Sequence, residues 1–286
     1  MSRASDTIVA TVVKTAFALL RALPVDAASA LGGALARSIG PRLRVHRIAE
    51  RNLRRALPQL DDAAVRRTLR DMWDNLGRTG AEFSDVARIP LERIEIIGRK
   101  HIDALRDDGK PGILISGHIG NWELMQVTWA RLGLRALGIY RADNNEATDW
   151  IFQDLRERSG NTFAPKGKRA ARAILSELRR GGHVALLVDQ KQNDGMAAPF
   201  FGRDAMTGYV VAEMALRFEC PIMPMRVERL NGAHFRVIAD APFTVHPTGD
   251  HAADVLRVTR QINEILETWI TARPEQWFWV HRRWPD

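Results

Sequence analysis

Short apolar runs between residues 93 and 238 constrain the fold more than any other feature of the sequence. Each run has the length and composition of a buried strand, and most are separated by helical stretches long enough for parallel pairing. Asn231-Gly232, between two of the runs, predicts an antiparallel hairpin at one edge. We therefore expect an α/β fold with a single mixed, mostly parallel sheet flanked by helices. The runs are Arg93–Ile97, Gly112–Ser116, Leu134–Tyr140, His183–Asp189, Ile222–Val227 and His234–Ile238.

The chain has 286 residues and contains no internal repeat and no Ser/Gly/Pro-rich linker. This length is sufficient for one substantial core, so we expect a single domain, 1–286. Residues 1–88 are predicted to be mainly helical, with a turn and a helix start at Pro58–Asp62. Residues 89–286 are predicted to form the α/β core.

A single cysteine, Cys220, excludes an intrachain disulfide and a cysteine-based zinc site. It lies in an apolar stretch before Pro221, which favours a buried strand residue. An acyl-cysteine intermediate is the alternative.

The segment Ile113–Met125 reads as a strand, a turn and a helix, with His118 on the turn and Glu123 in the first helical turn. In one continuous helix, residues five apart point in directions about 140° apart, so the two side chains need the break that Gly117 and Gly120 provide. The Glu123 carboxylate would then hold one imidazole tautomer and stabilise the imidazolium. The alternative is a structural histidine beside a helix-capping carboxylate.

Asp189 and Gln190 follow another predicted strand. Chemistry in open α/β sheets gathers outside the carboxyl ends of strands, where both His118 and Asp189 are expected. Asp189-Gln190 would orient the active site or the acceptor. The alternative is a polar cap on the end of the strand.

The His118–Glu123 spacing resembles the H-x4-D/E motif of the glycerolipid acyltransferase superfamily, and His-Ile-Gly-Asn-Trp-Glu resembles the form found in lipid A late acyltransferases. Further blocks occur in that family's order and cover roughly residues 45 to 284. One departure is Ala142-Asp-Asn-Asn145 after Tyr140-Arg141, where the family has a proline-containing turn. The blocks are Arg51–Pro58, Trp73–Arg78 with Glu82, Tyr140-Arg141, Arg156-x-Arg158-x-Gly160, Asp189-Gln190, Pro199–Gly202 with Thr207, and Pro274–Trp284.

The resemblance implies a glycerol-3-phosphate acyltransferase-like fold and an enzyme that uses neither a metal nor a cofactor. His118 would deprotonate an acceptor hydroxyl, which attacks an acyl thioester. Backbone amides near Gly120, or the amide of Asn121, would stabilise the tetrahedral oxyanion. The donor would be acyl carrier protein or acyl-coenzyme A, with the carrier protein favoured, and the acceptor a glycolipid.

Each of the other blocks fits two roles. Arg156 and Arg158 would bind phosphate or steady the thioester, or form an exposed basic helix face. Phe200 and Phe201 would contact the acyl chain or pack in the core. The C-terminal tryptophans would anchor the protein at an interface or pack against the sheet. They are Trp277, Trp279 and Trp284.

The net charge is +8, and only six of the 42 basic residues are lysines. Arginine binds phosphate in a bidentate manner, so the basic run Arg42–Arg55 favours an anionic membrane surface or a phosphorylated lipid. A solvated helix face and an arginine-rich genome are the alternatives. Nucleic-acid binding is disfavoured because no binding motif occurs and the aromatic residues gather near the C-terminus instead.

Residues 7–23 predict a helix with a broad apolar face and a narrow polar stripe. Lys14 interrupts the apolar segment, which argues against a cleaved signal peptide and a spanning helix. We expect a monotopic helix at the cytoplasmic face of the inner membrane, the alternative being a helix packed on the core.

Two other classes of protein fit the sequence less well than an acyltransferase. A serine hydrolase is disfavoured because no G-x-S-x-G occurs. A non-catalytic lipid-binding protein gives no reason for the His118–Glu123 pattern. Among acyltransferases, families that act on phosphatidylinositol mannosides, ornithine lipids or pigments remain alternatives.

Overall fold

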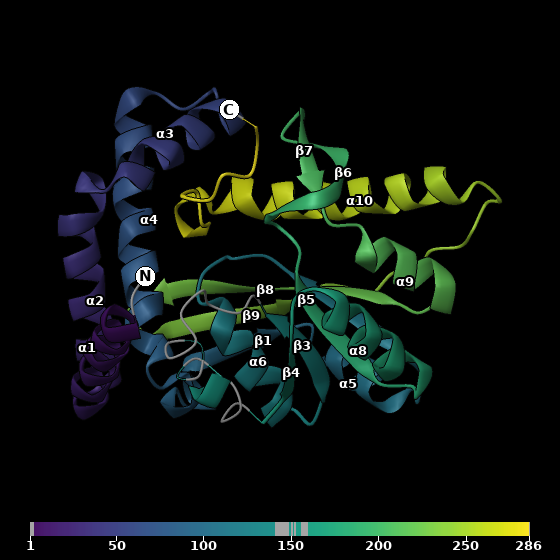
Figure 1. Ribbon diagram of the computed structural model, residues 1–286, viewed down its shortest axis with the longest axis horizontal. Helices are drawn as coiled ribbons and strands as arrows, with labels where there is room; N and C mark the ends of the chain where they lie inside the picture. The colour runs from purple at the N-terminus through teal and green to yellow at the C-terminus, as the bar shows by residue number, and fades with distance from the viewer. Residues whose placement is uncertain (1–2, 141–148, 150, 152, 156–159, 286) are drawn as a thin grey trace.

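The computed structural model describes residues 3–140, 149, 151, 153–155 and 160–285, and confirms an α/β architecture of helices around a mixed sheet. In Figure 1, the N-terminal helices gather at one end of the molecule, and the sheet extends from them towards α8 and α9.

The N-terminal part is helical, as predicted. The expected turn before α4 is present, because the Asp61 side chain caps that helix by accepting a hydrogen bond from the Ala64 N–H. The elements are α1 (Arg3–Ala22), α2 (Val25–Ile39), a short 3₁₀ turn (Gly40–Arg42), α3 (Arg44–Ala56) and α4 (Asp62–Phe83).

The main sheet has seven strands in the order β1-β9-β8-β2-β5-β3-β4, and its pairs are parallel except for β8 with β9. The predicted antiparallel hairpin therefore exists, but its placement at the edge was wrong, because β1 pairs with the outer side of β9. β4 had not been predicted. The strands are β1 (Ile94–Ile97), β2 (Gly112–Ser116), β3 (Ala136–Tyr140), β4 (Thr162–Pro165), β5 (His183–Leu187), β8 (Ile222–Asn231) and β9 (His234–Ala239).

Alternate residues of the central strands enter two separate cores. Ile113 and Ile115 of β2 pack in the core formed with α9 and α10, whereas Leu114 packs in the core formed with α5 and α6. The sheet is thus covered on both faces, which explains why its strands read as continuous apolar runs. These helices, together with α8, are α5 (Arg99–Asp107), α6 (Trp122–Arg131), α8 (Lys168–Arg179), α9 (Val210–Phe218) and α10 (His251–Ala272).

A separate two-stranded hairpin, which the sequence analysis did not predict, packs against α10 (Figure 1). It consists of β6 (Lys191–Phe200) and β7 (Arg203–Thr207). Its turn is made by Phe201 and Gly202, which both have positive φ. The chain that follows α10 packs beneath this hairpin and buries three tryptophans, Trp277, Trp279 and Trp284. The interfacial role considered for these tryptophans is therefore wrong, and the packed alternative holds.

The helices at the N-terminal end carry most of the exposed apolar surface. Among the described residues, the large apolar side chains that remain exposed lie between residues 8 and 45, apart from Ile97 and Leu230. On α2, Leu31, Leu35 and Ile39 form a stripe at four-residue spacing. No helix in the described part of the chain combines the length and the hydropathy needed to cross a bilayer.

Candidate active site

The site is positioned by two neighbouring parallel strands, β2 and β5. Their register pairs Ser116 with Leu187, the last residue of each strand. His118 and Asp189 each lie two residues beyond these ends, so the sheet places them side by side. The Val188 N–H donates to the Ser116 carbonyl at 2.9 Å and continues the pairing up to the site.

Asp189 holds His118 at two points. One carboxylate oxygen lies 2.8 Å from the imidazole Nδ1, and the other accepts a hydrogen bond of 2.8 Å from the His118 backbone N–H. The Trp277 indole N–H donates to that second oxygen at 2.8 Å. With Nδ1–H donated to the carboxylate, Nε2 carries the free lone pair, which is the tautomer that a general base needs.

The ionised form of Asp189 is favoured although the side chain is buried. Burial by itself raises the pKa of this carboxyl, but the charge of His118 and the hydrogen bonds from His118 and Trp277 outweigh burial and lower the pKa to about 2. Asp189 therefore stays negatively charged at neutral pH. The expectation that it orients the active site agrees with this geometry.

Glu123 occupies a different place from the one expected. Among the described residues, the His118 ring hydrogen-bonds with Asp189 and Gln190 and not with Glu123. Glu123 lies in the first turn of α6, is largely buried and accepts a hydrogen bond from the Gln126 side-chain amide at 3.1 Å. The predicted contact between Glu123 and His118 was wrong, because the turn directs Nδ1 across the sheet towards β5.

The His118 ring faces a cavity of about 680 Å³. Gln190 also lines it, with its amide nitrogen 3.3 Å from His118 Nε2. The walls come from β2, β3, β5, α6, α8 and α9 and are mostly apolar, while Glu123, Gln126 and Lys166 add polar groups. Such a lining suits a long apolar ligand with a polar end.

Gly120 and Asn121 do not offer the donors predicted for the oxyanion. The Gly120 N–H donates to the Gln276 carbonyl at 3.0 Å, and the Asn121 side-chain amide donates to Glu82 at 2.7 Å. Asn121 is fully buried and also caps α6 through its side-chain oxygen. Both residues therefore build the turn instead of facing the cavity.

Gly120 needs to be glycine for two reasons. Its φ is +58°, and a Cβ there would lie 2.2 Å from the Val227 carbonyl oxygen. Its own carbonyl accepts hydrogen bonds from the side chains of Asn75 and Thr79 on α4. The turn that carries His118 is thus held against α4 and β8.

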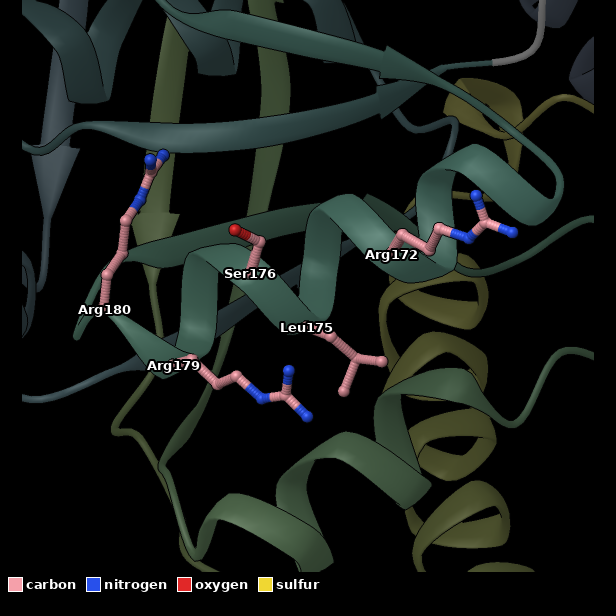
Figure 2. Close-up of a pocket in the computed structure, with 5 residues that line it drawn as sticks. All are labelled: Arg172, Leu175, Ser176, Arg179 and Arg180. Carbon is pink, nitrogen blue, oxygen red and sulfur yellow. The ribbon is translucent and has the colours of Figure 1, made fainter.

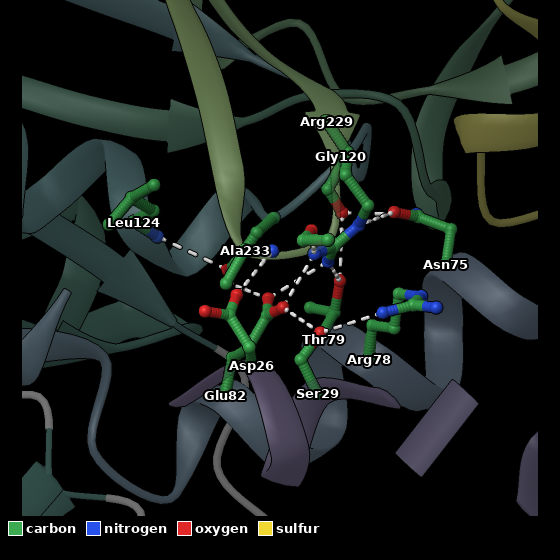
Figure 3. Close-up of polar contacts among 12 residues, drawn as sticks. Asp26, Ser29, Asn75, Arg78, Thr79, Glu82, Gly120, Leu124, Arg229 and Ala233 are labelled. Atoms are coloured by element: carbon green, nitrogen blue, oxygen red, sulfur yellow. Dashed lines mark hydrogen bonds and ion pairs between the residues drawn. The ribbon is translucent and has the colours of Figure 1, made fainter. Parts of the chain in front are cut away.

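A buried ion pair supports this arrangement (Figure 3). Arg229 of β8 contacts both carboxylate oxygens of Glu82 on α4, at 2.5 and 2.9 Å. The same guanidinium donates to Asn75 and Thr79, the two residues that hold the Gly120 carbonyl. Ser29 of α2 also donates to Glu82, at 2.6 Å. The network therefore connects the N-terminal helices to the turn that carries His118, and Arg229 was not identified from the sequence.

Residues near the C-terminus brace the other side of the site. Asn52 of α3 donates to the carbonyls of Trp279 and His281. His281 Nε2 in turn accepts a hydrogen bond of 2.9 Å from the Lys191 N–H, two residues after Asp189. Together with the Trp277 bond to Asp189, these contacts fix the segment that follows β5.

Phe200 and Phe201 lie away from the cavity wall. Phe200 is fully buried against Trp277 and Trp284, and the partly buried Phe201 meets Phe200 and Trp284 edge-on. The core-packing alternative therefore holds for Phe200, while contact of Phe201 with an acyl chain stays a prediction. Arg283 lies over the Phe200 ring and donates to Met206 and Thr207, which ties β7 to the C-terminal segment.

The remaining candidates from the sequence are arginines and the single cysteine. Arg141, Arg156 and Arg158 lie outside the described residues. In the basic run, Arg54 forms ion pairs with Glu50 and Asp62, which partly neutralise it. Cys220 is buried, and burial raises the pKa of its thiol to about 11, which argues against a nucleophilic thiolate.

Comparison with known proteins identifies the family. A model of the bacterial lipid A biosynthesis acyltransferases matches residues 2–286. The chain belongs to this family. It is therefore an enzyme that transfers acyl groups, as the resemblance implied.

Curated relatives are distant in sequence but similar in extent. A lipid A biosynthesis acyltransferase of Haemophilus influenzae is 23% identical over 92% of this chain and 83% of its own length. A lipid A biosynthesis lauroyltransferase of Escherichia coli is 24% identical over 83% of this chain and 78% of its own length. A lipid A biosynthesis palmitoleoyltransferase of the same organism is 23% identical over 82% of this chain and 77% of its own length. The names of the two Escherichia coli proteins specify different acyl chains.

Proposed function

We propose that this acyltransferase moves a fatty acyl chain from an acyl thioester to a hydroxyl of a lipid A precursor, with His118 as general base. The observation that carries the proposal is the His118–Asp189 pair at the cavity: Nδ1 is held by a buried, ionised carboxylate, and Nε2 faces the space in which a substrate would bind.

The acceptor hydroxyl is a poor nucleophile at neutral pH until its proton is removed. In our proposal, His118 Nε2 takes this proton as the oxygen attacks the thioester carbonyl. The positive charge that develops on the imidazole is stabilised by Asp189, 2.8 Å from Nδ1. Asp189 thus replaces Glu123 as the carboxylate that orients the base.

The tetrahedral intermediate carries an oxyanion that needs hydrogen-bond donors. Gln190 is the best placed candidate, because its amide nitrogen lies 3.3 Å from His118 Nε2 on the cavity wall. When the acceptor hydroxyl occupies Nε2, the amide is released to donate to the oxyanion. Collapse of the intermediate expels the thiolate, which takes the proton back from His118, so no acyl-enzyme forms.

Glu123 remains a candidate site residue, acting on substrate instead of on His118. Its carboxylate lies in the first turn of α6, where the helix dipole favours a negative charge, and it lines the cavity. We propose that it accepts hydrogen bonds from polar groups of the sugar headgroup. The apolar walls formed by residues such as Ile139 and Ile174 would hold the acyl chain.

We propose that the protein is peripheral or monotopic at the cytoplasmic face of the inner membrane. The exposed apolar side chains of α1 and α2, with Leu43 and Val45 near the start of α3, suit insertion into the lipid interface. Arg42, Arg44 and Arg47 lie in the same region of the chain and suit anionic headgroups. This surface extends the expected interfacial helix to two more helices.

The experiment that tests the proposal measures transfer of a labelled acyl group from acyl carrier protein to a tetra-acylated, Kdo-bearing lipid A precursor. Wild type should form the product and His118→Ala should not. A fully active His118→Ala would refute the mechanism. Turnover of the thioester with another lipid acceptor only, such as a phosphatidylinositol mannoside or an ornithine lipid, would keep the chemistry and change the acceptor.

A further inference from the structure

The exposed side of α8 carries arginines that the proposed mechanism does not use. Arg169, Arg172 and Arg179 are exposed and share one helical stripe with Ser176. Within the described part of the chain, none of the three forms an ion pair, whereas arginines such as Arg106 and Arg236 are paired with acids. The nearest acid on the helix, Glu177, is paired with Arg180.

The stripe also has a shape that can receive a partner. A surface hollow of about 330 Å³ is lined by Arg172, Leu175, Ser176, Arg179 and Arg180 (Figure 2). In this view Arg172 and Arg179 project from either side of Leu175, and Arg180 points away from Arg179. A small apolar centre between two cations suits a protein surface in which carboxylates flank an apolar side chain.

The same helix forms a wall of the active-site cavity. Ala170, Ala171 and Ile174 line that cavity, together with Lys166 and Gly167 just before the helix. A partner docked on the outer stripe would therefore sit next to the cavity in which its cargo reacts. Within the described residues, exposed arginines such as Arg66 and Arg67 lie on α4, which does not line the cavity.

We propose that the α8 stripe, Arg169, Arg172 and Arg179, is the docking surface for the acidic carrier protein that presents the acyl thioester. The inference rests on the proposed function and specifies its donor. At 1.5 Å per residue the stripe extends about 15 Å from Arg169 to Arg179. Charges spread over this length match carboxylates distributed along a protein helix, whereas the phosphates of coenzyme A form a compact anion.

A lipid surface is a weaker match for the stripe. Insertion into a membrane needs exposed large apolar side chains. These gather between residues 8 and 45 in the described part of the chain, and α8 carries none. In Figure 1, α8 lies at the opposite end of the sheet from α1 and α2. The two ends can therefore serve the acceptor in the membrane and the donor in the cytoplasm.

The test reverses two charges, R172E/R179E, and uses R66E/R67E as the matched control. Arg66 and Arg67 are exposed on α4, and the control changes the net charge by the same amount. Each protein is assayed with one acyl chain on two donors, holo acyl carrier protein and pantetheine. Because interfacial charges act mainly on association, we expect kcat/KM for the carrier-linked donor to fall about tenfold or more in R172E/R179E, with KM rising.

We expect R172E/R179E to keep its kcat/KM with the pantetheine-linked donor. R66E/R67E should keep its kcat/KM with both donors. Equal losses with both donors, or no loss with the carrier, would overturn the proposal. Weaker binding of R172E/R179E to phosphatidylglycerol vesicles, with carrier kinetics unchanged, would assign the stripe to the membrane instead. If wild type transfers from neither donor, the proposed function fails, and direct binding of the carrier protein to wild type and to R172E/R179E still decides whether the surface exists.

Discussion

The substitution Asp189→Asn tests whether Asp189, and not Glu123, is the carboxylate that supports His118. The substitution keeps the shape of the side chain but removes its charge. A unit charge about 4 Å from the imidazolium contributes about 4 kcal/mol at an effective dielectric constant of about 20. Losing it from the transition state, at about 1.4 kcal/mol per factor of ten, lowers kcat by about three orders of magnitude.

The hydrogen bonds add to this effect. Asp189 accepts from the His118 backbone N–H, from Nδ1 and from the Trp277 indole. An asparagine has one oxygen and one amide group, so its nitrogen must face one of these donors. The imidazole would then turn or adopt the other tautomer; in the Ser-His-Asp triads of serine proteases, loss of the carboxylate costs about 10⁴ in kcat.

The assay is steady-state acyl transfer by Asp189→Asn and Glu123→Gln at saturating donor, with the fold of each variant verified by circular dichroism. Glu123→Gln should mainly raise KM for the acceptor, because Glu123 lines the cavity without a hydrogen bond to the His118 ring. The reasoning is refuted if Asp189→Asn retains kcat within tenfold of wild type while Glu123→Gln loses three orders of magnitude.

Three further predictions concern stability and membrane binding. Glu82→Ala leaves the buried Arg229 guanidinium without its carboxylate and should lower the free energy of unfolding by about 3–5 kcal/mol in urea titrations, whereas replacing both residues by apolar ones should cost less. Because the pKa of Asp189 is lowered from 3.8 to about 2, its interactions contribute about 2 kcal/mol to stability above pH 3.8, and this contribution is lost as the pH falls towards 2. The difference in unfolding free energy between wild type and Asp189→Asn should therefore shrink over that range, and a constant difference would contradict the assignment. Leu35→Asp places a charge in the exposed apolar stripe of α2 and should weaken sedimentation with phosphatidylglycerol vesicles about tenfold or more, whereas unchanged binding would move the membrane surface elsewhere.

The sequence predicted the sheet because its strands are buried on both faces and therefore stand out as apolar runs. The β6–β7 hairpin was missed because Lys191–Phe200 contains polar residues, a glycine and a proline, and lacks regular alternation. β4, with only Thr162–Pro165, is too short to be distinguished from a loop. The placement of the β8–β9 hairpin was wrong because the sequence does not indicate that β1 pairs beyond β9.

Within the site, residue types were easier to predict than partners. His118 and Asp189 were both expected at strand ends, but the order of strands in a sheet cannot be read from the sequence, so the pairing of β2 with β5 was not predicted. Arg229 was missed because an arginine in a strand next to a predicted turn is usually solvated, and its partner Glu82 lies 147 residues away. Phe200 was misassigned because an aromatic side chain suits a lipid and a core equally well.

The way in which the two strands place His118 and Asp189 has a consequence for insertions and deletions. Each residue is located by a fixed count of two beyond its strand, so a one-residue deletion between Leu187 and Asp189 would turn the carboxylate to the other face of the sheet. The pair is 71 positions apart along the chain, and the stretch between α6 and β5 is under no such constraint. Segments between the strands can therefore lengthen or shorten, and reshape the cavity for another acyl chain, while His118 and Asp189 keep their geometry.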